Sequence, residues 1–120
     1  MVAIFNYDNY PEISINFVGE LTDENFNDFI NEWMTLYLKK QYFTFVFDTK
    51  EIDYVPISYC FKMAAFIKLL KREKIQYLQN SKIIIHNIFI RRLLDLIFYI
   101  QPPIAPVSII DKDGIVLSQL

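Results

Sequence analysis

The run from Tyr42 to Phe47 (YFTFVF) constrains the fold of this chain more than any other segment. Five of its six residues are apolar, so an extended backbone here carries apolar side chains on both faces. That pattern is typical of a strand in the interior of a sheet whose two faces are both covered. We therefore expect a β-sheet that has this segment as a central, buried strand.

The segments around this strand alternate between two hydrophobic periods. Residues 13–18 (ISINFV) repeat with period two, which predicts a strand paired with residues 2–7 in a hairpin. From Thr22, a predicted N-cap, apolar residues recur at intervals of three and four, as in an amphipathic helix. The full pattern predicts strands at 2–7, 13–18, 42–47, 82–85 and 107–110, and helices at 23–40, 58–77 and 88–100.

This order of elements predicts the fold class. Two strands followed by alternating helices and strands are typical of a mixed α/β sheet whose later strands are joined by right-handed crossovers. A chain of 120 residues is long enough to bury one core and too short for two. We predict a single domain, residues 1–120, with about five strands, an N-terminal hairpin and three helices.

Composition excludes several classes of protein. The only two glycines, Gly19 and Gly114, lie far apart, so no glycine-rich phosphate-binding loop can form. Cys60 is the single cysteine, which rules out an intramolecular disulfide and favours a reducing compartment. No apolar run reaches the roughly 18 residues that a membrane-spanning helix needs, and the first residues lack the pattern of a secretory signal. We expect a cytoplasmic protein without a membrane span.

The charges are unevenly distributed along the chain. Residues 1–38 contain seven acids and no Lys or Arg, whereas residues 39–100 contain eleven bases and five acids. Such asymmetry favours an oriented encounter with another charged protein, although ordinary solvated helix faces give the same pattern. The basic segment 58–77 has no recognition motif and no aromatic residues interleaved with its exposed lysines, so we expect no nucleic-acid partner.

Two short motifs, together with the order of elements, resemble a known family. The segment Phe17 to Thr22 (FVGELT) is similar to the Gly-Glu-Leu-Asp motif of STAS domains, whose free-standing bacterial members are anti-sigma-factor antagonists. In that family a connector after the central strand ends in Asp-Ser-Ser-Gly, and a partner kinase phosphorylates the second serine. The corresponding positions here are Pro56 to Tyr59 (PISY), which keep only Ser58. The resemblance implies a regulatory protein with a degraded phosphorylation loop and an anti-sigma-factor-type kinase as a partner.

Ser58 is the candidate phosphorylation site. A phosphate at the start of a helix meets free amides and the positive end of the helix dipole. Lys62 lies one turn further along the same predicted helix. Alternatively, Ser58 is simply the N-cap of that helix. We predict that a partner protein contacts the residues around this helix start, which are Pro56, Ile57, Ser58, Tyr59 and Lys62.

The predicted helix 88–100 is apolar on nearly every side. If one side packs on the sheet, then Phe89, Leu96 and Tyr99 fall on other sides. So many exposed apolar residues suggest that another surface buries them, either a partner protein or a second copy of the chain. A tail of the same chain, residues 115–117, is an equally good alternative.

No catalytic or metal site is predicted. Asp48 ends the central strand, but the further acids of a phospho-accepting site of the response-regulator type are missing, so we interpret it as a turn residue. His86, the only histidine, has no second histidine or accessible cysteine pair with which to share a metal, and we interpret it as a hydrogen-bonded residue at a strand end. We expect no enzyme activity and no cofactor.

The sequence leaves three hypotheses for function. The first is a non-enzymatic regulatory module that acts by binding another protein. The second is a sensor domain that binds a small molecule or nucleotide in the crevice at the carboxyl ends of the strands. The third is a structural homodimer built on the helix at 88–100.

Overall fold

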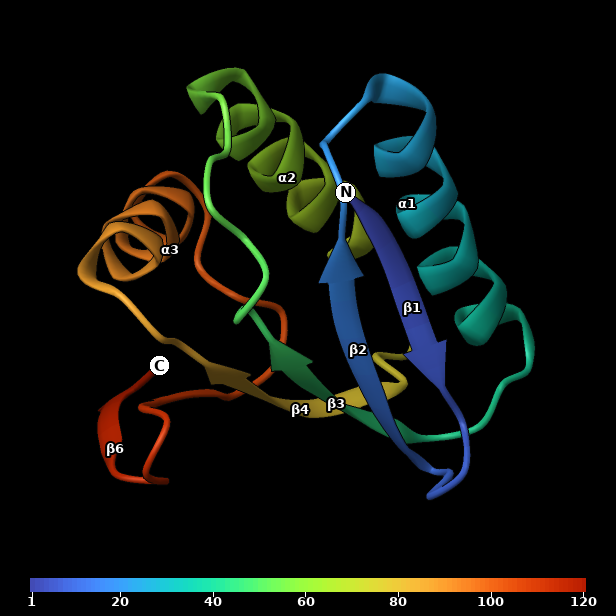
Figure 1. Cartoon of the computed structure of the whole chain (residues 1–120). Helices are drawn as coiled ribbons and strands as arrows, with labels where there is room; N and C mark the ends of the chain where they lie inside the picture. The colour runs from blue at the N-terminus through green and yellow to red at the C-terminus, as the bar shows by residue number, and fades with distance from the viewer.

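A computed structural model describes all 120 residues, and it confirms the α/β fold with a mixed sheet and three helices (Figure 1). The sheet has six strands, one more than the sequence predicted. The strands are β1 (Val2–Asn6), β2 (Glu12–Val18), β3 (Phe43–Asp48), β4 (Leu78–Ile84), β5 (Val107–Ile110) and β6 (Val116–Gln119), and the helices are α1 (Asp23–Leu38), α2 (Ile57–Leu70) and α3 (Ile88–Ile100).

The strands lie in the sheet in the order in which they occur in the chain. The hairpin β1–β2 and the pair β5–β6 are antiparallel, and β2, β3, β4 and β5 are parallel. All three crossovers therefore step in the same direction along the sheet. Because each crossover is right-handed, α1, α2 and α3 all lie on the same face (Figure 1). The molecule has two layers, and the second face of the sheet carries no helix.

This arrangement corrects the expectation that β3 is buried on both faces. Phe43, Phe45 and Phe47 point toward the helices and are buried, whereas Thr44 and Val46 are half-buried on the other face. The sequence could not distinguish these two cases, because Val46 is as apolar as the residues that face the core.

Helix α1 begins at the predicted cap. The Thr22 hydroxyl oxygen accepts a hydrogen bond from the Asn25 amide at 3.2 Å, and the Asn25 side chain accepts one from the Thr22 amide at 2.8 Å. This capping box satisfies two amides that a helix start otherwise leaves free. At the other end of α1, Leu36 is buried and Leu38 is 77% exposed.

Helix α2 ends at Leu70, seven residues before the predicted end. Residues 71–77 form a turn and a short connection, because strand β4 already begins at Leu78 and not at Lys82. The side chain of Gln76 holds this connection in place by donating to the Leu70 carbonyl at 2.8 Å and accepting from the Tyr37 hydroxyl at 2.7 Å.

Strand β4 contains a bulge that changes which of its residues face the helices. Phe43 of β3 lies opposite Leu78, but Phe45, two residues later, lies opposite Ser81, three residues later. One extra residue in a strand shifts the alternation of its side chains by one position. Leu78, Ser81 and Ile83 therefore all point toward the helix layer and are buried.

The sixth strand is formed by the C-terminal tail. Asp111 caps a turn by accepting hydrogen bonds from the amides of Asp113 and Ile115, and the chain then returns along β5. The tail thus does not fold over the outer side of α3, which was one of the two alternatives. The guanidinium of Arg91 in α3 donates to the Ser118 hydroxyl of β6, and this is the link between the two elements.

No helix combines the length and the apolar character required to cross a membrane.

Helix α2 packs against α3, and α1 packs against β1 (Figure 1).

Candidate functional site

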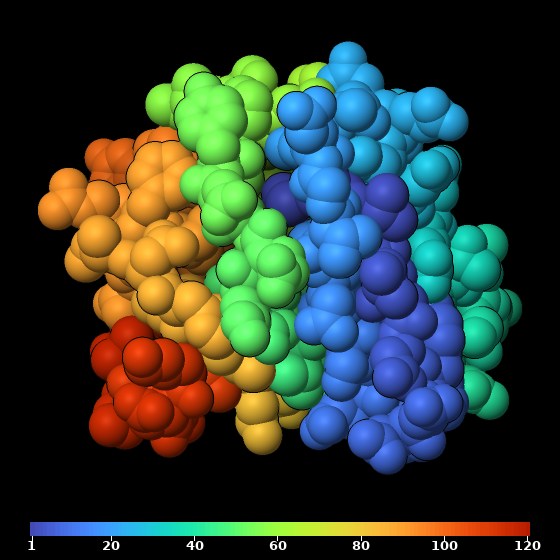
Figure 2. Space-filling view, in the orientation of Figure 1, coloured from blue at the N-terminus to red at the C-terminus, as the bar shows by residue number.

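The carboxyl ends of the parallel strands and the amino ends of the helices meet at one edge of the sheet (Figure 1). A surface hollow of about 590 Å³ lies at this edge. It is bounded by the turn 18–21, which joins β2 to α1, and by residues 51–56 of the connector between β3 and α2. Figure 2 shows the recess between these two segments, which are light blue and green, with dark blue N-terminal residues at its base. In open α/β sheets, ligands bind at this edge.

The start of α2 differs from the expectation that Ser58 caps it. The helix begins at Ile57, Pro56 occupies the N-cap position, and no side chain makes a capping hydrogen bond. Ser58 is the second residue of the helix and is exposed. The interpretation of Ser58 as an N-cap is therefore wrong, and its role as a phosphorylation site stays a prediction.

Tyr59 and Lys62 form a polar cluster with the first residue of α1. The Tyr59 hydroxyl donates to Asp23 Oδ1 at 2.6 Å, and Lys62 Nζ donates to the same oxygen at 2.9 Å. The Lys62 ammonium also lies 4.6 Å from the centre of the Tyr59 ring. The hydrogen bonds from Tyr59 and from Lys62 lower the pKa of Asp23, and the bond to Asp23 raises the pKa of Tyr59 and that of Lys62. The cluster joins the amino ends of α1 and α2.

The outer surface of α2 is more apolar than the sequence indicated. Phe61 is 52% exposed and Leu69 is 53% exposed. Ile57, one turn before Phe61, and Ala65, which lies between Phe61 and Leu69, are also exposed. These residues are four apart, so they lie along one side of the helix. Four bases are exposed on the same helix and its C-terminal end: Lys62, Lys68, Lys71 and Arg72. We call the surface that these four apolar residues and four bases form the α2 stripe.

Helix α3 carries the other predicted partner-binding residues. Phe89 is partly exposed, Leu96 is half-buried, and Tyr99 is 88% exposed. The two helices are neighbours, and Lys71 at the end of α2 donates to the Gln101 side chain just after α3 at 2.7 Å. The predicted residues therefore fall on two adjacent helices.

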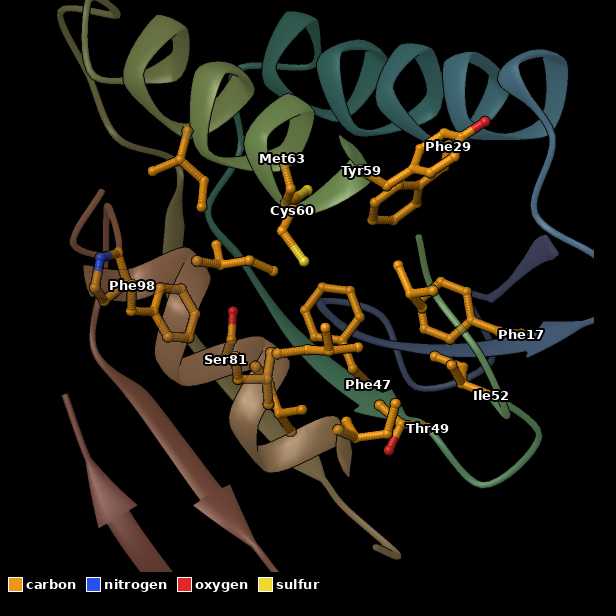
Figure 3. A pocket seen from close by; sticks show the side chains of 18 of the residues that line it. Phe17, Phe29, Phe47, Thr49, Ile52, Tyr59, Cys60, Met63, Ser81 and Phe98 are labelled. Atoms are coloured by element: carbon orange, nitrogen blue, oxygen red, sulfur yellow. The ribbon is translucent and has the colours of Figure 1, made fainter. Parts of the chain in front are cut away.

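An apolar cavity of about 190 Å³ lies between the helices and the sheet, and nothing in the sequence indicated it. Its walls come from all three helices and from β2, β3, β4 and β5 (Figure 3). Most of the wall is aliphatic or aromatic, and no charged side chain contributes. Central wall residues are Phe17, Phe29, Trp33, Phe47, Ile52, Cys60, Met63, Ile67, Ile83, Leu94 and Phe98.

Two buried hydroxyl groups interrupt this apolar wall. Thr49 donates its hydroxyl hydrogen to the Ile84 carbonyl at 2.7 Å, so its donor is already used. Ser81 is 5% exposed and lines the cavity, and its hydroxyl bonds to no other group of the chain, although its oxygen is not fully enclosed. Figure 3 shows its oxygen directed away from the sheet into the space below the helices. The indole nitrogen of Trp33 is the one side-chain polar atom that is fully buried without a hydrogen-bond partner.

The surface hollow and the cavity are adjacent. Met1, Leu21 and Ile52 line both of them. The hollow carries the acids Glu20, Glu51 and Asp53, whereas the cavity behind it is uncharged. The acidic surface and the apolar interior thus lie side by side at this edge of the sheet.

The remaining polar candidates have structural roles. Asp48 accepts from the Lys50 amide at 3.0 Å, as a turn residue does, and its carboxylate lies 2.9 Å from His86 Nε2. Both interpretations of these residues are confirmed. Nowhere do three His, Cys, Asp or Glu side chains converge as metal ligands. Cys60 is buried, and burial raises the pKa of its thiol.

No family model, no curated protein and no solved structure matches this chain. The resemblance to STAS domains therefore stays a prediction that rests on the motifs and on the order of elements.

Proposed function

We propose that this chain is a non-enzymatic, regulatory protein-interaction module whose partner binds the α2 stripe and the adjacent exposed side of α3. The observation that carries the proposal is the exposure of Phe61 and Leu69 on a helix whose other side is already packed on the core. This helix has apolar residues on its outer side as well as on the side that faces the core. Covering the outer side with a second surface removes apolar area from water, which is favourable.

The composition of the stripe suits a protein partner. Aromatic residues and arginine are enriched where proteins bind each other, and a few such residues supply most of the binding energy. The exposed aromatic residues are Phe61 on α2, and Phe89 and Tyr99 on α3. The exposed lysines favour a partner with acids around an apolar centre, because such charges steer the encounter and fix its orientation.

Phosphorylation of Ser58 is the regulatory part of the proposal. The hydroxyl is exposed in the first turn of α2, next to Ile57 at the start of the stripe. A phosphate adds a charge of about −2 at this end of a basic surface. It therefore weakens the attraction of the stripe for an acidic partner. The resemblance of residues 17–22 and of the position of Ser58 to STAS domains supports the same mechanism.

Affinity purification of the tagged chain from its native cells tests the proposal. Three forms are compared: the unaltered chain, the double variant Phe61→Ser/Leu69→Ser, and the control Leu38→Ser, which changes an exposed leucine of α1. We expect a partner that co-purifies equally with the unaltered chain and the control. The amount of partner that co-purifies with the double variant should be lower by at least about tenfold, because two apolar anchors of an interface each contribute more than ~1 kcal/mol.

Equal recovery of every co-purifying protein with the double variant would contradict the proposal. Intact mass measurement of the same purified chain shows whether Ser58 carries phosphate. Co-expression of two differently tagged copies distinguishes a partner protein from the homodimer alternative, since a homodimer brings down the second tag.

A further inference from the structure

We infer that the cavity between the layers is a binding site for a small, neutral, mainly apolar molecule with one hydrogen-bonding oxygen, and that the Ser81 hydroxyl is the group that recognises it. This site is separate from the α2 stripe, and neither depends on the other.

The size of the cavity sets the size of the ligand. A cavity of about 150 Å³ lined by Leu, Ile and Phe stays dry and binds benzene. The cavity here is somewhat larger, at about 190 Å³, and has a similar wall. It fits a molecule of one six-membered ring with a substituent.

The charges around the path set the charge of the ligand. Apart from the amino group of Met1, no charged group belongs to the residues that line the cavity, so an ion that passed beyond Met1 would lose its hydration without gaining a partner. Glu20, Glu51 and Asp53 line the adjacent hollow and repel carboxylates that approach from that side. A neutral molecule meets neither obstacle.

Ser81 sets the polar group of the ligand. A hydroxyl buried among apolar groups costs free energy unless a hydrogen bond satisfies it. The neighbours of Ser81 on the inner face of β4, Leu78 and Ile83, offer its hydroxyl no side-chain partner, so a ligand oxygen in the cavity would supply one. Thr49, the other hydroxyl in the wall, already donates to Ile84. Ser81 is therefore the free hydroxyl of the cavity.

The bulge in β4 is an independent observation that points to Ser81. With regular alternation from Leu78, Asn80 and Lys82 would face the helices. The bulge moves both of them outward and places Ser81 in the cavity wall instead. Bulges commonly aim a side chain at a site in this way.

Two probe molecules of nearly the same shape test the inference. Cyclohexanol carries a hydroxyl where methylcyclohexane carries a methyl group. Trp33 is the only tryptophan and lines the cavity, so its fluorescence reports the entry of either probe. Neither probe absorbs light at the wavelengths that tryptophan absorbs or emits. Titration calorimetry of the full chain measures the two dissociation constants independently.

We expect the unaltered chain to bind both probes. Ser81→Ala should weaken cyclohexanol about fivefold, the effect of one net hydrogen bond, and change methylcyclohexane by less than about twofold. Ser58→Ala makes the same substitution on the surface and should change neither. Cys60→Met places a larger side chain in the cavity wall and should abolish binding of both probes while the chain stays folded.

Three results would overturn the inference. The first is that neither probe binds the unaltered chain. The second is that Ser81→Ala affects the two probes equally. The third is that Cys60→Met, folded as judged by its circular dichroism, still binds them, which would place the probes elsewhere.

Discussion

Tyr59 donates its hydroxyl hydrogen to Asp23 at 2.6 Å, and this bond joins the first turn of α2 to the first residue of α1. Lys62 donates to the same carboxylate oxygen. This polar link adds to two aromatic contacts between the same helices, Phe26 with Tyr59 and Trp33 with Phe66. The link has consequences for the pH dependence of stability.

Because the hydrogen bonds from Tyr59 and Lys62 lower the pKa of Asp23 in the folded chain, its ionised form stabilises the fold. This stabilisation is fully present above the ordinary aspartate range and is lost as the pH falls through the lowered pKa. We expect Asp23→Asn to lower the melting temperature at neutral pH and to make no difference at the acid end. The effect is small, because Asp23 and Lys62 are exposed to solvent.

Asp28→Asn is the control for this prediction, since Asp28 is an exposed residue of the same helix that pairs with no base. Melting temperatures of the three proteins are compared across the acid range. A gap between Asp23→Asn and the unaltered chain that stays constant down to the lowest pH would argue against a titrating link.

Leu69 and Leu70 are adjacent in sequence and opposite in environment. Leu69 is 53% exposed, whereas Leu70 is 1% exposed. We expect Leu70→Ala to lower the free energy of unfolding by about 2–5 kcal/mol, and Leu69→Ala to change it by less than about 0.5 kcal/mol. Urea denaturation of both variants measures this. Similar losses for the two would mean that the α2 stripe is not on the surface.

The two buried hydroxyls of the cavity wall should respond oppositely to removal. Thr49→Val deletes a donor that is bonded to the Ile84 carbonyl, so we expect a loss of about 0.5–1.5 kcal/mol in the free energy of unfolding. Ser81→Ala deletes a hydroxyl that has no partner, so we expect no loss or a gain of up to about 1 kcal/mol. A clear loss for Ser81→Ala in chemical denaturation would show that this hydroxyl is satisfied within the chain.

The helix starts offer a test of the role of Ser58. Asn87 caps α3 by accepting a hydrogen bond from the Ile90 amide at 2.9 Å, whereas Ser58 makes no capping bond. We expect Asn87→Ala to cost about 1 kcal/mol of stability and Ser58→Ala to cost less than about 0.5 kcal/mol. Thermal unfolding compares them directly. An equal cost at both positions would restore the capping role of Ser58.

Local signals in the sequence predicted most of the fold. The cap at Thr22 and the three- and four-residue spacing after it require only neighbours along the chain, so α1 was predicted to within two residues. The inner face of α2, including Cys60, Ala64 and Leu70, followed from the same periodicity. Strand β6 was missed because it is short, exposed and held only by pairing with β5.

The candidate sites were harder to predict, for physical reasons. Ser81 lies among polar residues, and only the register of β4 against β3 turns it inward. Phe61 and Leu69 are apolar like their buried neighbours, so composition alone could not indicate their exposure. A cavity depends on how side chains from distant segments fill the space between layers, and no segment carries that information alone.

The most direct test of the proposed function places a photo-crosslinking residue at Leu69 in the full chain and irradiates the native cells. The same residue at Leu38, the exposed leucine at the end of α1, is the control. The α2 stripe predicts a discrete crosslinked species from position 69, larger than the chain, that position 38 does not give. The same products from both positions, or no product from position 69, would contradict the claim that this surface binds a partner.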